Sequence, residues 1–101
     1  MTADELKTVL SQGRKAVQAL NIAGNNPAAV SPAQLERMEK DISAAQHIID
    51  RVSEPTDAAI LQLYYLQCAT WHDVACHAGY TDTHTMRRAR WAIQELAEKA
   101  E

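Results

Sequence analysis

The sequence contains no phenylalanine and only two cysteines, three glycines and three prolines among its 101 residues. Two cysteines are too few for a disulfide framework and are typical of proteins from a reducing compartment. The scarcity of glycine and proline, together with many alanines and leucines, favours helix over strand. A chain of this length is too short for a multidomain enzyme, so we expect a small all-α protein.

Long hydrophobic runs and a strong charge of one sign are also missing. No apolar run approaches the roughly 20 residues that a membrane helix requires, and the N-terminus lacks the pattern of a signal peptide. We therefore expect a cytoplasmic protein with no membrane partner. The net charge of −3 does not favour a nucleic-acid partner, although three arginines gather at positions 87, 88 and 90 of an otherwise acidic C-terminal half.

The common catalytic motifs are absent as well. The sequence has no nucleophile elbow, phosphate-binding loop or HExxH motif, so we do not expect an enzyme. Cys68, His72 and Cys76 lie four residues apart, with His77 and His84 nearby, and these are zinc-ligand residue types. Because no second Cys-x-x-Cys pair accompanies them, we expect neither a metal nor another cofactor.

Two helices are predicted within residues 1–53. The first spans about residues 3–20 and begins at a capping box formed by Thr2 and Glu5. Turn-forming residues at 21–27 predict a loop. The second helix begins at Ser31, where Pro32 and Gln34 complete another capping box, and it runs to about residue 52.

The second of these helices carries an apolar seam with alternating spacings of three and four residues, a pattern that requires a packing partner. The partner is either the first helix, which gives a helical hairpin within the chain, or a second copy of the chain. Both arrangements can hold together, so residues 1–53 are a possible dimerisation arm of a homodimer. The seam consists of Leu35, Met38, Ile42, Ala45, Ile49 and Val52.

Three further helices are predicted within residues 54–101. The first, at about residues 57–67, begins after Thr56 as the N-cap and is apolar nearly all round. The second, at residues 71–78, begins after Thr70 and ends at Gly79. The third begins after Thr81 or Asp82 and runs to about residue 99. The residues expected inside this domain include Trp71, Val74, Ala75, Ala78, Tyr80, Met86, Ala89, Ile93 and Leu96.

A short helix, a turn at glycine and a longer polar helix with a basic outer face are typical of a helix-turn-helix domain. Ala75 supplies the small side chain that such a helix contact requires. The expected fold is therefore all-α, with an N-terminal helical hairpin at residues 1–53 and a three-helix helix-turn-helix domain at residues 54–101.

In such a domain the last helix enters the major groove of double-stranded DNA. Its arginines can pair with guanine or phosphate, and its N-terminal N–H groups can hold a phosphate. The arginines could instead form an ordinary solvated face, and Trp91 could pack against the hairpin or a second copy. The residues predicted to contact DNA are Thr81, Asp82, Thr83, His84, Arg87, Arg88, Arg90 and Trp91.

Residues 57–97 resemble the C-terminal domain of small phage-encoded transcription regulators, which are similar to region four of sigma factors and to the RinA and ArpU late-gene activators. The resemblance lies in the pattern L-Y-Y, T-W-x-x-V-A-x-x-x-G-Y-T, Arg87 and A-I-x-x-L. It implies a phage or prophage transcription regulator, dimeric or in contact with RNA polymerase or a sigma factor, at the nucleoid of a bacterial host. Thr85 and Arg88 depart from the pattern, so the core register of the last helix, at Thr85 or at Met86, stays open.

Two other functions fit the same fold. An acidic surface suits a basic protein partner, which favours a protein-binding module that acts on RNA polymerase or another host complex. A small subunit of a phage DNA-packaging machine is the other alternative.

Overall fold

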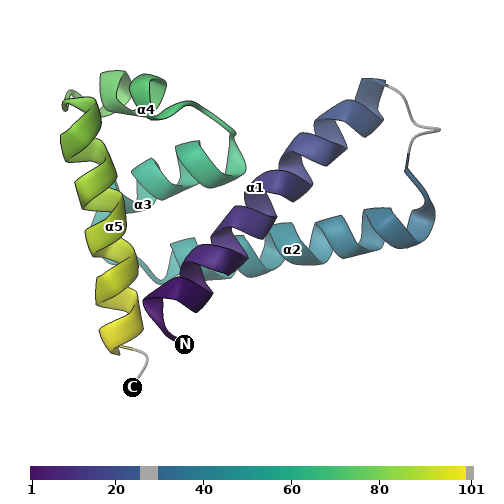
Figure 1. Ribbon diagram of the computed structural model, residues 1–101, viewed down its shortest axis with the longest axis horizontal. Coiled ribbons are helices and arrows are strands. Elements are labelled where there is room, and N and C mark those ends of the chain that lie inside the picture. The colour runs from purple at the N-terminus through teal and green to yellow at the C-terminus, as the bar shows by residue number, and fades with distance from the viewer. Residues whose placement is uncertain (26–29, 100–101) are drawn as a thin grey trace.

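The computed structural model describes residues 1–25 and 30–99, and Figure 1 shows their arrangement. Every regular element in these residues is helical, which confirms the all-α prediction. None of the helices in these two ranges is long and apolar enough to cross a membrane. The elements are α1 (Ala3–Asn25), α2 (Pro32–Asp50), α3 (Pro55–Leu61), η2 (Gln62–Leu66), α4 (Trp71–Ala78) and α5 (Asp82–Lys99).

Helices α1 and α2 begin as the sequence predicts. The Thr2 hydroxyl accepts a hydrogen bond from the Glu5 backbone N–H at 3.2 Å, and the Glu5 carboxylate accepts one from the Thr2 N–H at 3.1 Å. Ser31 and Gln34 form the same reciprocal pair at the start of α2. Helix α1 continues to Asn25, so the predicted loop is wrong at residues 21–25, and residues 26–27 lie outside the described part. Asn and Gly disfavour a helix only weakly, and the preceding helix extends through them.

Helices α1 and α2 come close together at Gly13, which is buried. A Cβ atom at this glycine would lie 2.5 Å from the Cβ of Ala45 on α2. The two backbones can approach this closely only because Gly13 has no side chain. A glycine, which lowers the intrinsic stability of a helix, therefore allows α1 to pack against α2.

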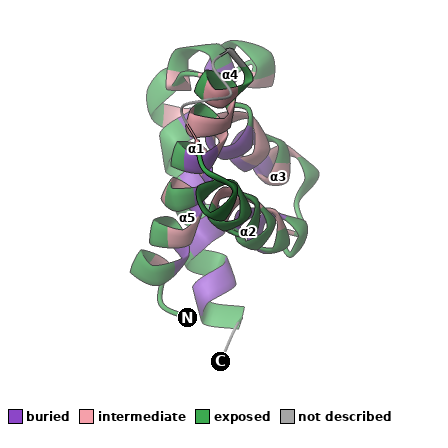
Figure 2. Ribbon diagram, turned by 90° about the vertical axis from the view of Figure 1, so that its right-hand side faces the viewer, coloured by how far each residue is buried: buried purple, intermediate pink, exposed green. Residues whose placement is uncertain are grey.

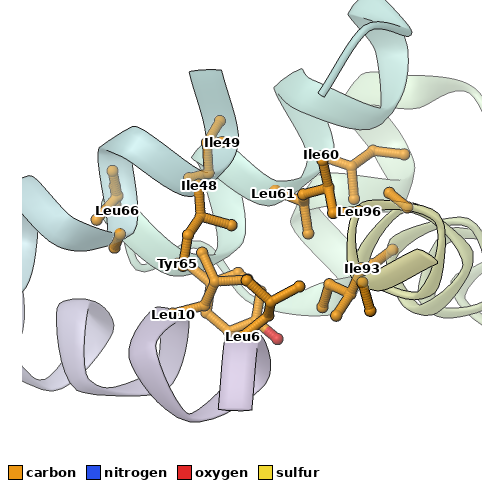
Figure 3. Packing of buried hydrophobic residues seen from close by; sticks show 14 of the residues in the cluster. Leu6, Leu10, Ile48, Ile49, Ile60, Leu61, Tyr65, Leu66, Ile93 and Leu96 are labelled. Atoms are coloured by element: carbon orange, nitrogen blue, oxygen red, sulfur yellow. The ribbon is translucent and has the colours of Figure 1, made fainter. Parts of the chain in front are cut away.

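One hydrophobic cluster draws side chains from all the elements (Figures 2 and 3). Its members come from both sides of residue 53, so the N-terminal helices and the C-terminal helices share a core. The large residues of this core are Leu6, Leu10, Ile48, Ile49, Ile60, Leu61, Tyr65, Leu66, Val74, Ile93 and Leu96.

Helix α3 begins two residues earlier than predicted. The Glu54 carboxylate accepts a hydrogen bond from the Asp57 N–H at 2.8 Å, and Pro55 is the first helical residue. The expectation of Thr56 as N-cap is therefore wrong, because an acidic cap followed directly by proline outcompetes it. The helix then widens into the π-helical turn η2, which ends at Leu66. Cys68, in the connection that follows, has a φ of +57°, which is unusual for a residue other than glycine.

A connection of three residues joins α4 to α5. Gly79 has a φ of +74°, and its N–H donates to the Ala75 carbonyl oxygen, which ends α4 as predicted. Ala75 is buried, as the contact between the two helices requires. Tyr80, expected in the core, is 37% exposed, because its ring packs edge-on against His84 at the surface.

The register of α5 places Thr85 in the core. Thr85 is fully buried, and its hydroxyl donates to the Thr81 carbonyl oxygen at 2.9 Å, which offsets the cost of burying it. Met86 is 38% exposed, so the prediction that it fills the core is wrong. Ala89, Ile93 and Leu96 are buried as predicted.

Candidate nucleic-acid interface

The outer face of α5 carries the exposed basic side chains of the C-terminal half. Thr83, Arg87 and Arg90 follow one another at helical spacing, and all three are exposed. Neither of these two arginines forms an ion pair with an acidic residue in the ranges 1–25 and 30–99. Their guanidinium groups are therefore available to an anionic partner.

Trp91 lies beside these arginines and is 63% exposed. The indole ring therefore does not pack against the N-terminal helices of its own chain, which was one of the alternatives for this residue. The Arg88 guanidinium lies 5.3 Å from the centre of the ring, within the range of a cation–π contact. The ring therefore lies at the edge of the basic face of α5, on the side of Arg88.

Arg88 points away from that face and toward α3. Its Nε and Nη2 atoms donate to the two carboxylate oxygens of Asp57 at 3.0 and 2.7 Å, and Asp57 is 3% exposed. These hydrogen bonds and the negative charge of Asp57 raise the pKa of Arg88. Arg88, which the sequence analysis placed in the groove, is therefore engaged in holding α5 against α3.

The N-terminus of α5 faces solvent. The Thr81 hydroxyl accepts a hydrogen bond from the His84 N–H at 3.1 Å, so Thr81 caps the helix, and the His84 ring is partly buried beneath Tyr80. The backbone N–H groups of Asp82 and Thr83 in the first turn have no carbonyl partner within the helix and lie at its positive end. A phosphate oxygen could bind at this position.

The Asp82 side chain contacts α4. One of its carboxylate oxygens lies 3.2 Å from Nδ1 of His72, and Nε2 of the same ring lies 3.8 Å from the sulfur of Cys76. Cys68 lies elsewhere and donates to the Arg14 carbonyl oxygen. Within the described residues, no group of three or more His, Cys, Asp or Glu side chains is arranged to hold a metal ion.

The predicted seam of α2 is divided between the core and the surface. Ala45 and Ile49 are buried inside the chain, whereas Leu35 at the beginning of the helix is 39% exposed. The other members, Met38, Ile42 and Val52, are partly buried. The second half of the seam therefore closes within the chain, and its first half remains accessible.

One group of residues was missed by the sequence analysis. The Arg14 guanidinium donates to the carbonyl oxygens of Tyr64 and Ala69 and lies 4.1 Å above the Tyr64 ring. Trp71 stacks on the other face of that ring, with 3.8 Å between the ring centres. Tyr64 and Trp71 are seven residues apart, a spacing that suggests proximity, but no sequence signal connects them with Arg14.

Comparison of the chain with known proteins identifies no relative. No protein-family model, curated protein or solved structure matches the chain. The resemblance to phage regulators therefore stays a prediction from the sequence motif.

The arrangement at α5 combines three kinds of contact. Arginine can donate two parallel hydrogen bonds to a guanine edge or to a phosphate, and helix N–H groups can bind a phosphate. An exposed indole ring can stack on a sugar or pack on an apolar surface. The face therefore presents groups that can bind an anion and a ring that can contact an apolar surface.

Proposed function

We propose that this chain binds double-stranded DNA through the N-terminal half of α5. The observation that supports the proposal is the set of Thr83, Arg87, Arg90 and Trp91, which are exposed together on one face while Thr85 and Ala89 fix the opposite face in the core. A helix held in this way can present its arginines to a major groove without losing its packing.

The connection between α4 and α5 supports the same proposal. A short helix, a glycine in the left-handed conformation and a following longer helix is the arrangement by which helix-turn-helix proteins hold a recognition helix. The ion pair of Asp57 with Arg88 also favours the proposal, because it holds α5 against α3 with the face of Arg87 and Arg90 outward.

The more specific role, a phage or prophage transcription regulator with RNA polymerase or a sigma factor as a further partner, depends on the sequence motif of residues 57–97. The net charge of −3 and the few exposed arginines of one chain suggest that two copies bind together, because phosphate contacts supply most of the affinity for DNA. A homodimer would present two sets of Arg87 and Arg90.

The test is the binding of a fluorescent duplex from the DNA that flanks the gene, measured by anisotropy with unlabelled competitor DNA. We expect Arg87→Ala/Arg90→Ala to weaken binding at least tenfold and to reduce the slope of log affinity against log salt by roughly two, because about one counterion is released per phosphate contact. Arg37→Ala/Arg51→Ala removes the same charge from exposed positions at α2 and is the matched control.

The proposal fails if the wild-type chain does not bind DNA at low salt, or if the two double variants weaken binding equally. In that case the exposed ring of Trp91 favours a protein partner. The next experiment is a pull-down that compares how much purified host RNA polymerase is retained by the wild type and by Trp91→Ala.

A further inference from the structure

A cleft of about 540 Å³ opens between α1, the segment from η2 to the start of α4, and α5. This volume lies within the range of sites that bind small organic molecules, roughly 300–1,000 Å³. The cleft lies beside the face of α5 that is proposed to bind DNA. Among the residues predicted to contact DNA, Arg90 alone also lines the cleft.

Part of the cleft wall is apolar and includes aromatic rings. Tyr65 and Trp71 line it from the segment that precedes α4 and from α4 itself, and Met86 and Ile93 line it from α5. Met86 is 38% exposed here, although a methionine at this position would ordinarily be expected in the core. Flat rings and a flexible thioether are well suited to contact a flat apolar molecule.

The charge on the cleft is positive. Lys7 and Arg14 from α1 and Arg90 from α5 line it, and Asp4 is the single carboxylate among the lining residues. The Arg14 guanidinium is held by two backbone carbonyl groups and by the Tyr64 ring, so its charge has a fixed position. Within residues 1–25 and 30–99, no carboxylate forms an ion pair with it. A ligand with a negative group would therefore be favoured over a neutral or positive one.

The hydroxyl group of Tyr65 is a further polar group at the cleft. The residue is 4% exposed, yet its hydroxyl forms no hydrogen bond with any residue in the part of the chain that the structure describes. Tyr65 lines the cleft, and its hydroxyl is not sealed from solvent. Burial raises the pKa of Tyr65, so the hydroxyl remains a hydrogen-bond donor at neutral pH.

We infer that the cleft binds a small aromatic carboxylate, with the flat body between Trp71, Met86 and Ile93 and the carboxylate near Tyr65 and the cationic rim. The inference stands apart from DNA binding, because the ligand needs only the folded chain. A carboxylate is the group that accepts from a tyrosine hydroxyl and pairs with guanidinium or ammonium groups at once.

The test uses the full chain labelled with ¹⁵N and three probes: 2-naphthoate, its neutral amide 2-naphthamide, and inorganic phosphate. We expect 2-naphthoate to produce saturable shifts at the Trp71 indole N–H and at the Arg90 and Ile93 amides. The amide should bind about tenfold more weakly, because it lacks the charge that strengthens the hydrogen bond. Phosphate should produce no saturable shift at these three cleft signals, because it lacks an apolar body.

Two variants test the polar contacts. Tyr65→Phe keeps the ring but removes the donor, and we expect about tenfold weaker binding of 2-naphthoate with unchanged helicity by circular dichroism. Arg90→Gln should weaken binding about threefold, as an exposed ion pair is worth little. Arg87→Gln, an arginine of α5 outside the cleft, is the matched control and should bind as the wild type does.

The inference is wrong if 2-naphthoate produces no saturable shift, or if the shifts map away from the cleft. Equal affinity for the acid and the amide would overturn the role of the cationic rim, and saturation by phosphate alone would overturn the need for an aromatic body. Loss of DNA binding in the Arg87→Ala/Arg90→Ala variant would have no bearing on these outcomes.

Discussion

At the scale of single residues, Arg87, Arg88 and Arg90 are neighbours in sequence but have different environments. Arg87 and Arg90 are exposed, whereas Arg88 donates two hydrogen bonds to the buried carboxylate of Asp57. The sequence could not separate them, because the partner of Arg88 is 31 positions away on another helix. A test that removes Arg87 and Arg88 together would confuse loss of binding with loss of stability.

The first prediction concerns this pair. We expect Arg88→Ala to lower the melting temperature by about 5–10 °C, because it leaves the Asp57 carboxylate buried without a cation. Arg87→Ala should change the melting temperature by less than about 3 °C, as a substitution at an exposed position does. Thermal melts followed by circular dichroism measure both. Adding Asp57→Asn to Arg88→Ala should recover part of the loss, and equal melting temperatures for the two single variants would contradict a structural role for the pair.

At the scale of elements, the packing of α1 on α2 depends on one glycine. The contact at Gly13 leaves no room for a methyl group, because Ala45 and the Asp41 carbonyl oxygen of α2 already occupy the space around it. Gly24 lies in the same helix, and nothing lies within 4 Å of the position where its Cβ would be. The two glycines therefore form a matched pair for a test of this interface.

We expect Gly13→Ala to destabilise the fold by about 1–2 kcal/mol, because the cost of overpacking exceeds the gain in helix propensity. Gly24→Ala should stabilise it by up to about 1 kcal/mol, because only the propensity changes. Urea unfolding followed at 222 nm gives both values. A stabilising Gly13→Ala would show that the two helices can separate at this point without cost.

The helices themselves could largely be predicted from local signals. Ser31, Thr70 and Gly79 mark helix ends through their own side chain or backbone, and each acts in the structure as the sequence indicates. The errors arose where a neighbouring residue provided a competing cap or satisfied a polar side chain inside the core. Glu54, not Thr56, caps α3. Thr85 lies in the core, where its hydroxyl donates to the carbonyl oxygen of Thr81, one turn earlier in the chain.

The candidate site could be predicted less well than the fold. The exposed face of α5 follows from helical spacing, so Thr83, Arg87 and Arg90 lie together as expected. The ion pair of Arg88 and the Arg14–Tyr64–Trp71 stack join residues far apart in sequence, and periodicity carries no information about such contacts. The cleft is lined by residues of α1, η2, α4 and α5, so it could not be predicted from the sequence pattern of any one helix.

At the scale of the whole molecule, the N-terminal and C-terminal helices share one hydrophobic core. Leu6 and Leu10 of α1 lie in one cluster with Ile93 and Leu96 of α5 (Figure 3). The exposed large apolar side chain of α2 is consequently Leu35, at the beginning of the helix, and Ile22 is exposed near the end of α1.

The last prediction separates self-association from folding. We expect light scattering to give twice the mass of one chain for the wild type and the mass of one chain for Leu35→Asp, with unchanged helicity, because position 35 lies on the accessible half of the seam. Ile49→Asp should lose helicity whatever its oligomeric state, because it places a charge at a position that is 3% exposed in the core of a single chain. A wild type with the mass of one chain would contradict the dimer. Unchanged helicity in Ile49→Asp would instead show that α2 does not need this contact with the core.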